Sequence, residues 1–278
     1  VYGKHIIVEK PMALRVADAD EMIRACAERN IRLFVVKQNR FNLPVIKMRE
    51  ALESGRFGKI VSGSIRLRWC RSQAYYDQDS WRGSWALDGG VLANQASHHL
   101  DLLMWMLGDV QSVFAMTRTA LVDIEAEDTA VVCLRFCSGA LATVEATTAT
   151  RPRDLEGSLT ILGSNGVVEI GGFAVNQIKT WAFADSSEQD LEMIDGYSVN
   201  PPDVYGFGHR AYYENIVATL SSDFTGCSSR VGGTAIEGLE GRKSLELLTA
   251  IYESAETGRE IHLRLNPRFC RLGEIVKL

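Results

Sequence analysis

The first forty residues alternate between short apolar runs and one amphipathic stretch. The apolar runs at 5–8 and 32–36 predict two strands of the kind that lies buried in a parallel sheet. Residues 16–28 between them have the spacing of an amphipathic helix. A strand, a helix and a strand at this spacing predict a right-handed βαβ unit. A further helix is predicted from 42 to 53.

From Ile60 onwards the apolar positions recur with period two, which is typical of strands with one wet and one dry face. Such runs occupy 60–69, 113–116, 129–136, 140–147, 159–162, 167–170 and 178–182. Helical spacing returns at 209–220 and 235–257, and the polar segment 186–202 is predicted as a surface loop.

Together these patterns predict an α/β plus α+β fold. Residues 1–41 are predicted to form a parallel α/β unit. Residues 42–278 are predicted to form an open-faced, largely antiparallel sheet domain with flanking helices. In such proteins the active site tends to lie where the strand ends of the first domain meet the second.

Composition and charge exclude several classes of protein. A net charge of −5 argues against a nucleic-acid-binding protein, and no apolar run is long enough to cross a membrane. None of the six cysteines forms a CxxC pair, so neither a metal site nor a disulfide framework is expected. Cys133 and Cys137 are predicted to be core residues, and the expected location is the cytoplasm.

The stretch from Asp88 to Asp101 carries the strongest chemical signal. A glycine pair opens it, and the apolar run that follows has helical spacing to Leu107. Asn94, His98 and Asp101 are then expected on one helix face, where a histidine suits proton transfer near neutral pH. The alternative is a structural histidine held by Asp101. His99 is expected to point elsewhere, with a structural role or a place at a subunit contact.

Two motifs in this order resemble the Gfo/Idh/MocA oxidoreductase superfamily. The first is Glu9-Lys10-Pro11 directly after a strand, and the second is Gly-Gly-x-Leu-x-Asn-x-x-x-His-x-x-Asp at 89–101. The resemblance implies a dinucleotide-binding domain followed by an open antiparallel sheet, and it implies that residues 1–41 are the C-terminal remnant of a Rossmann-type parallel domain. It also implies hydride transfer between a sugar or polyol carbon and NAD or NADP.

A narrower resemblance is to the UDP-N-acetylglucosaminuronate 3-dehydrogenases, which act in surface-polysaccharide synthesis. The segments that carry it are 36–40, 75–77, 81–83, 94–96, 146–152 and 205–209. This resemblance implies oxidation of the C3 hydroxyl of a UDP-N-acetyl-hexosaminuronate. It also implies a homo-oligomer, a dimer or a tetramer, that packs through the sheet face.

The resemblance implies roles for individual residues. Lys10 would orient the reacting hydroxyl, His98 would be the general base, and Asn94 stands where the wider superfamily often has aspartate. Glu9, Lys10 and Pro11 would contact the cofactor. The residues expected to bind substrate are Arg40, Gln73, Tyr75, Arg82, Gln95, Arg151 and Tyr205. Arg66, Arg68 and Arg71 are as consistent with a solvated strand face, and no metal is expected.

The chain has no G-x-G-x-x-G before a helix, the loop that holds the cofactor's pyrophosphate in this superfamily. Roughly 60 to 90 residues of the nucleotide domain are therefore expected to be missing before Val1. Either they belong to a longer protein of which this sequence is a part, or the gene is a degenerate fragment. The 278 residues alone are then expected neither to bind NAD tightly nor to turn over. Alternatives are another sugar or polyol dehydrogenase of the superfamily, a glycosidase that uses NAD transiently, and a non-catalytic oligomerisation fragment.

Overall fold

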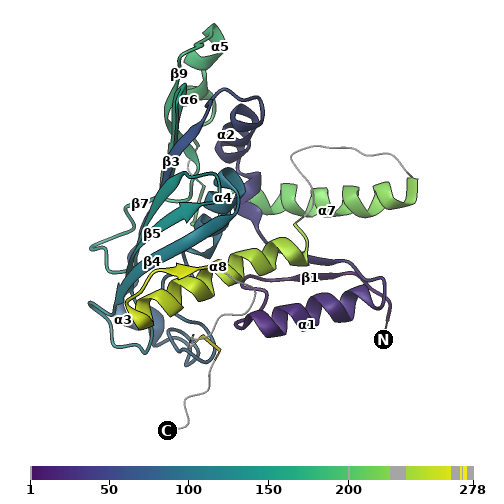
Figure 1. The fold of residues 1–278 in the computed structure, drawn as a ribbon, viewed down its shortest axis with the longest axis vertical. Coiled ribbons are helices and arrows are strands. Elements are labelled where there is room, and N and C mark those ends of the chain that lie inside the picture. The colour runs from purple at the N-terminus through teal and green to yellow at the C-terminus, as the bar shows by residue number, and fades with distance from the viewer. Residues whose placement is uncertain (1, 200, 226–235, 264–269, 271, 274–278) are drawn as a thin grey trace.

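The computed structural model describes residues 2–199, 201–225, 236–263, 270 and 272–273, and it contains two sheets (Figure 1). The smaller sheet consists of two parallel strands that are connected by a helix, as the βαβ pattern predicts. This N-terminal part consists of β1 (Ile6–Val8), α1 (Val16–Ala27), β2 (Leu33–Val35), the 3-10 helix η1 (Gln38–Phe41) and α2 (Leu43–Glu53).

The larger sheet has eight strands in the order β10-β4-β5-β6-β3-β7-β8-β9. All its neighbours are antiparallel except β3 and β6, which run parallel in a register that places Ile65 beside Val144. The strands are β3 (Ile60–Arg68), β4 (Val110–Arg118), β5 (Thr129–Phe136), β6 (Leu141–Thr147), β7 (Glu156–Gly163), β8 (Gly166–Gly171), β9 (Gln177–Phe183) and β10 (Ile261–His262).

Helices cover one face of this sheet. The remaining helices are α3 (Gln73–Tyr76), α4 (Ser97–Leu107), α5 (Glu188–Leu191), α6 (Met193–Gly196), α7 (Gly208–Thr225) and α8 (Gly238–Thr257). α4 packs on β3 and β7, while α8 packs on β4 and also contacts β2 and α1 (Figure 1). α8 therefore joins the parallel strands to the large sheet. Among the described residues, no helix is both long and apolar enough to span a membrane.

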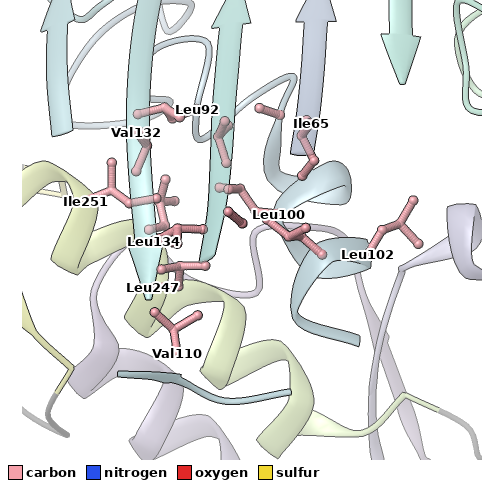
Figure 2. Close-up of a cluster of buried hydrophobic side chains, with 14 of the residues drawn as sticks. Ile65, Leu92, Leu100, Leu102, Val110, Val132, Leu134, Leu247 and Ile251 are labelled. Carbon is pink, nitrogen blue, oxygen red and sulfur yellow. The ribbon is translucent and has the colours of Figure 1, made fainter. Parts of the chain in front are cut away.

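The core lies between the large sheet and the two helices α4 and α8. Figure 2 shows Val132 and Leu134 of β5 against Leu247 and Ile251 of α8, with Leu100 of α4 beside them. Every second residue of β5 is buried, which is the alternation that the sequence pattern predicts. Burial of so many branched side chains, at roughly 1.5 to 3 kcal/mol each, provides most of the driving force for this arrangement.

Four local predictions are wrong. Ile6 and Ile7 of β1 are exposed (41% and 43%) rather than buried. Cys133 is exposed because it is one of the outward positions of β5, and Cys137 is exposed at the turn that follows. The predicted loop 186–202 contains α5 and α6. The helix expected from the glycine pair begins only at Ser97, after a run of turns. Cys227 lies outside the described residues.

Candidate active site

A cavity of about 450 Å³ lies beside the residues that follow β1, β2 and β3. The turn before α4, the helix α4 itself and the start of α7 close it from the other sides. Its lining consists of Glu9, Lys10, Gln38, Asn39, Trp69, Arg71, Tyr75, Asn94, Gln95, His98, His99, Val204, Tyr205 and His209. The carboxyl ends of the parallel strands therefore point at this cavity, as expected for an α/β ligand site.

The turn before α4 is built on a buried carboxyl group, that of Glu127. The Val91 N–H donates to the main-chain oxygen of Glu127 (2.9 Å), and the Leu92 N–H donates to its Oε1 (2.9 Å). A Cβ atom at Gly90 would lie 2.1 Å from that same main-chain oxygen, so only glycine fits here. Burial raises the pKa of Glu127 to about 7.

Asp101 holds elements together and does not contact His98. Two hydrogen bonds of 2.7 Å join its carboxylate to Arg40, and Ser244 of α8 donates a third (3.1 Å). Burial opposes its ionisation, but the charges of Arg40 and Lys37 hold the pKa of Asp101 below its usual value. The alternative of a structural histidine held by Asp101 is therefore wrong. Asn94 and His98 line the cavity, whereas Asp101 does not.

Lys10 and Asn94 are joined directly. The Lys10 ammonium donates to the main-chain oxygen of Asn94. The Asn94 side-chain amide donates to Asp88 (2.5 Å), whose other oxygen accepts from the Gly83 N–H (2.8 Å). Because the carboxylate takes the amide nitrogen, the amide oxygen of Asn94 is turned away from Asp88. Burial, reinforced by the nearby charge of Lys37, lowers the pKa of Lys10 to about 8.

His98 is uncharged at neutral pH. Burial lowers its pKa well below 6.5, and the charges of Lys10 and Lys37 lower it further. Its Nδ1 atom is buried and has no partner among the described residues. A neutral imidazole donates a hydrogen bond through one ring nitrogen and accepts one through the other. With its pKa this low, His98 does not readily take up a second proton near neutral pH.

Several other polar atoms on the cavity residues have no protein partner in the described part of the chain. They are Gln38 Oε1, Asn39 Oδ1, Gln95 Oε1 and both ring nitrogens of His99. Buried polar atoms are rarely left without partners, so this concentration indicates a site for a hydrogen-bonding ligand. Amide oxygens of this kind suit the donors of a nicotinamide carboxamide and of ribose or sugar hydroxyls.

Seven of the residues expected from the sequence meet at this cavity. They are Glu9, Lys10, Tyr75, Asn94, Gln95, His98 and Tyr205. Pro11 lines a separate small cavity. Gln73 and Arg82 line a neighbouring cavity, from which Arg82 donates to the Tyr75 hydroxyl (2.7 Å).

Two expected substrate-binding arginines make other contacts. The Nε and Nη2 atoms of Arg40 both donate to the buried carboxylate of Asp101, so this edge of the guanidinium is not open to a substrate. Arg151 donates to main-chain oxygens of the same region, among them those of Arg71 and Thr148. Neither side chain lines the cavity.

Sequence reasoning missed Trp69 as a cavity residue, left Arg71 open between a substrate contact and a solvated strand face, and placed His99 elsewhere. His99 is buried against Trp69, with ring centroids 6.0 Å apart, and burial lowers its pKa to about 4. A usable signal existed for Trp69 and Arg71. Both lie within three residues after a strand end, as Lys10 does, and residues just beyond strand ends are favoured at ligand sites.

Two family models match the chain. The GFO/IDH/MocA C-terminal domain matches residues 45–169, and the oxidoreductase family with an NAD-binding Rossmann fold matches residues 1–37.

Among solved structures, the chain is similar to the WlbA dehydrogenase from Bordetella pertussis in complex with NADH and UDP-GlcNAcA. The two are 45% identical with a TM-score of 0.83, and the match covers 95% of this chain and 74% of that one.

Two curated enzymes are also similar. D-Apiose dehydrogenase from Rhizobium rhizogenes is 25% identical over 92% of this chain and 72% of its own length. Myo-inositol 2-dehydrogenase from Thermotoga maritima is 36% identical over a match that covers 51% of this chain and 42% of that enzyme.

Proposed function

This chain belongs to the GFO/IDH/MocA family of oxidoreductases, and we propose that it oxidises the C3 hydroxyl of a UDP-N-acetyl-hexosaminuronate. The observation that carries the proposal is the cavity in which Lys10, Asn94 and His98 meet beside the ends of the parallel strands. The similarity to the WlbA dehydrogenase, whose structure holds NADH and UDP-GlcNAcA, supports the choice of substrate.

The residues on one side of the cavity suit NAD. Glu9 and Lys10 follow β1, and Gln38 and Asn39 follow β2 with unpartnered amide oxygens. We propose that these residues hold the nicotinamide end of NAD, which accepts a hydride when it is bound. Pro11, which was also expected to contact the cofactor, lines another cavity. We therefore propose that it acts only through its neighbour Lys10.

In the mechanism we propose, the hydroxyl proton moves to Lys10 Nζ. A lysine with a pKa of about 8 is partly uncharged near neutral pH, so its amine can accept a proton and then stabilise the oxygen it leaves. His98 remains neutral and orients the hydroxyl through a ring nitrogen. This assignment exchanges the roles expected from the resemblance, in which His98 is the base. The hydrogen bond from Lys10 to Asn94 positions the amine.

A neutral sugar or polyol is the second candidate substrate. The similarity to D-apiose dehydrogenase over 92% of this chain, and the local similarity to myo-inositol 2-dehydrogenase, favour it. The amide oxygen of Gln95 would accept a hydrogen bond from a sugar hydroxyl in either case.

The test measures NADH formation by the natural gene product that contains these residues. NAD is supplied with UDP-GlcNAcA, with D-apiose or with myo-inositol in separate reactions. We expect turnover of UDP-GlcNAcA, a loss of at least about 100-fold in Lys10→Met, and no loss in the exposed control Lys59→Met. Turnover of a neutral sugar alone would support the second candidate, and equal activity of the two lysine variants would contradict the mechanism. A parallel titration of NADH into residues 1–278 tests whether this chain by itself binds the cofactor weakly.

We also propose that the chain assembles through the uncovered face of the large sheet. Phe114 and Met116 of β4 and Val131 of β5 are exposed on this face, and Met116 pairs directly with Val131. Adjacent exposed apolar residues on a sheet are typical of a protein contact surface.

A further inference from the structure

We propose that Arg71 recognises an anionic group of the substrate and thereby restricts the cavity to acidic sugar derivatives. The anionic group is either a sugar carboxylate or a phosphate, since both present paired oxygens to a guanidinium. This inference rests on the proposed function and names the residue that would set its substrate class.

The Arg71 guanidinium is held between two aromatic rings. Its Cζ atom lies 5.3 Å from the ring centroid of Trp69 and 5.4 Å from that of Tyr75. Both rings are themselves fixed, because the Trp69 indole donates to the Phe173 carbonyl (3.0 Å) and the Tyr75 hydroxyl accepts from Arg82 (2.7 Å). The guanidinium therefore has a set orientation at the cavity wall before any ligand arrives.

One nitrogen of Arg71 is occupied and the others are not. Nη1 donates to the Cys70 carbonyl (2.7 Å) and to Asp154 (3.0 Å). Nε and Nη2 have no hydrogen-bond partner in the part of the chain that the structure describes, although the side chain is only 16% exposed. These two nitrogens form the edge of a guanidinium that binds a carboxylate or a phosphate with two parallel hydrogen bonds.

Neighbouring arginines do not offer the same fork to the cavity. Arg40 is paired with Asp101, Arg82 with Asp79, and Arg151 with main-chain oxygens. Within the described cavity lining, the other side chain that carries an amine or a guanidinium is Lys10, whose amine the proposed mechanism uses at the reacting hydroxyl. Arg71 is therefore the residue that we expect to bind an anionic group of the same ligand.

The experiment measures dissociation constants by calorimetry on the natural gene product. UDP-GlcNAcA is compared with UDP-GlcNAc, which has a hydroxymethyl group in place of the carboxylate, and with UDP. We expect Arg71→Gln to weaken UDP-GlcNAcA binding at least tenfold, and Arg71→Lys, which keeps the charge without the fork, to weaken it less. The matched control is Arg24→Gln, since Arg24 lies on the exposed surface of α1 and pairs with Glu28 (2.6 Å).

The pattern of losses identifies the anion. If Arg71→Gln weakens only UDP-GlcNAcA, the carboxylate is the group that Arg71 recognises. If all three ligands weaken alike, that group is the diphosphate. Wild-type affinity of both Arg71 variants, or an equal loss in Arg24→Gln, overturns the inference. If circular dichroism shows that Arg71→Gln does not fold, the dissociation constants of Arg71→Lys are used for the same comparison.

Failure of the proposed function gives a different result. A wild-type protein that binds UDP-GlcNAcA and NADH but transfers no hydride contradicts the reaction and leaves the Arg71 binding test intact. A wild-type protein that turns over, with unchanged affinities in the Arg71 variants, contradicts the Arg71 assignment alone.

Discussion

Lys10 owes its proposed chemistry to the place where its ammonium group lies. On an exposed surface a lysine keeps its proton to about pH 10. Here burial and the charge of Lys37 outweigh the opposing charges of Asp88 and Glu9, so the pKa falls to about 8. His98 experiences the same burial and the added charge of Lys10, which leaves it neutral. Lysine starts from a much higher pKa than histidine, so the same burial leaves Lys10 able to exchange a proton near pH 8 and leaves His98 uncharged.

A pH profile separates these two tasks. Because the uncharged amine of Lys10 is the proton acceptor in our mechanism, kcat/KM should rise with pH, with a midpoint near 8, and level off above it. His98→Asn should lower the rate but keep this midpoint. Lys10→Arg, which cannot lose its proton near pH 8, should remove the rising limb.

The opposite assignment has its own signature in the same measurement. A midpoint well below 6.5 that disappears in His98→Asn would show that His98 is the base and would contradict the role proposed for Lys10.

The turn before α4 is the element on which this site depends. It carries Asn94 and Gln95, leads directly into His98 and His99, and is anchored by hydrogen bonds to Glu127. Tyr252 of α8 donates to the same carboxyl group (3.0 Å), so the turn is also tied to the long C-terminal helix. Gly90 is needed because the turn lies directly against the Glu127 main chain, and Gly89 is needed because its φ of +77° is one that other residues rarely adopt.

Gly90→Ala should disrupt this element. The new methyl group would lie 2.1 Å from the main-chain oxygen of Glu127, so the turn must move and the hydrogen bonds from Val91 and Leu92 must stretch. We expect a loss of at least about 2 kcal/mol in the free energy of unfolding, measured in urea, together with loss of activity. The control is Gly196→Ala, whose methyl group meets nothing within 4 Å and should change stability by less than about 0.5 kcal/mol. Equal stabilities of the two variants would show that the turn tolerates displacement.

On the scale of the whole molecule, α8 connects the parts that build the site. It contacts β2 and α1 on one side and β4 and α4 on the other, and it lies across the large sheet (Figure 1). Ser244 of α8 also donates to Asp101, which holds Arg40 beside the cavity residues Gln38 and Asn39. In the part of the chain that the structure describes, no helix lies over the opposite face of the sheet (Figure 1), and apolar residues of that face are exposed.

Charge placed on this uncovered face should prevent assembly. Met116→Glu combined with Val131→Glu puts two carboxylates on directly paired positions, where a subunit interface would have to desolvate them. We expect sedimentation to show a smaller species for this double variant than for the wild-type protein, with the fold retained. Val217→Glu, at an exposed valine of α7, is the matched control and should leave the mass unchanged. An unchanged mass in the double variant would place the subunit contact elsewhere.

Periodicity in the sequence predicted most of the elements, because alternation and helical spacing are local properties of the chain. β5 coincides with its predicted range, and the ranges of α1 and α2 differ by a residue or two. The two motifs also identified the family and the residues Lys10, Asn94 and His98 that meet in the cavity. These predictions succeed because each depends on residues close together in the sequence.

The tertiary structure decided what each charged side chain pairs with. Arg40 lies in a family-like motif, and yet its guanidinium pairs with Asp101, 61 residues away. Arg71 lies against Trp69 and Tyr75 at the cavity, and two of its nitrogens have no partner among the residues that the structure describes. The pKa values of Lys10 and His98 likewise depend on burial by several segments of the chain. Spacing along a sequence carries no information on such long-range pairing or on desolvation, and these two effects determine which residues of this protein are free to bind and react.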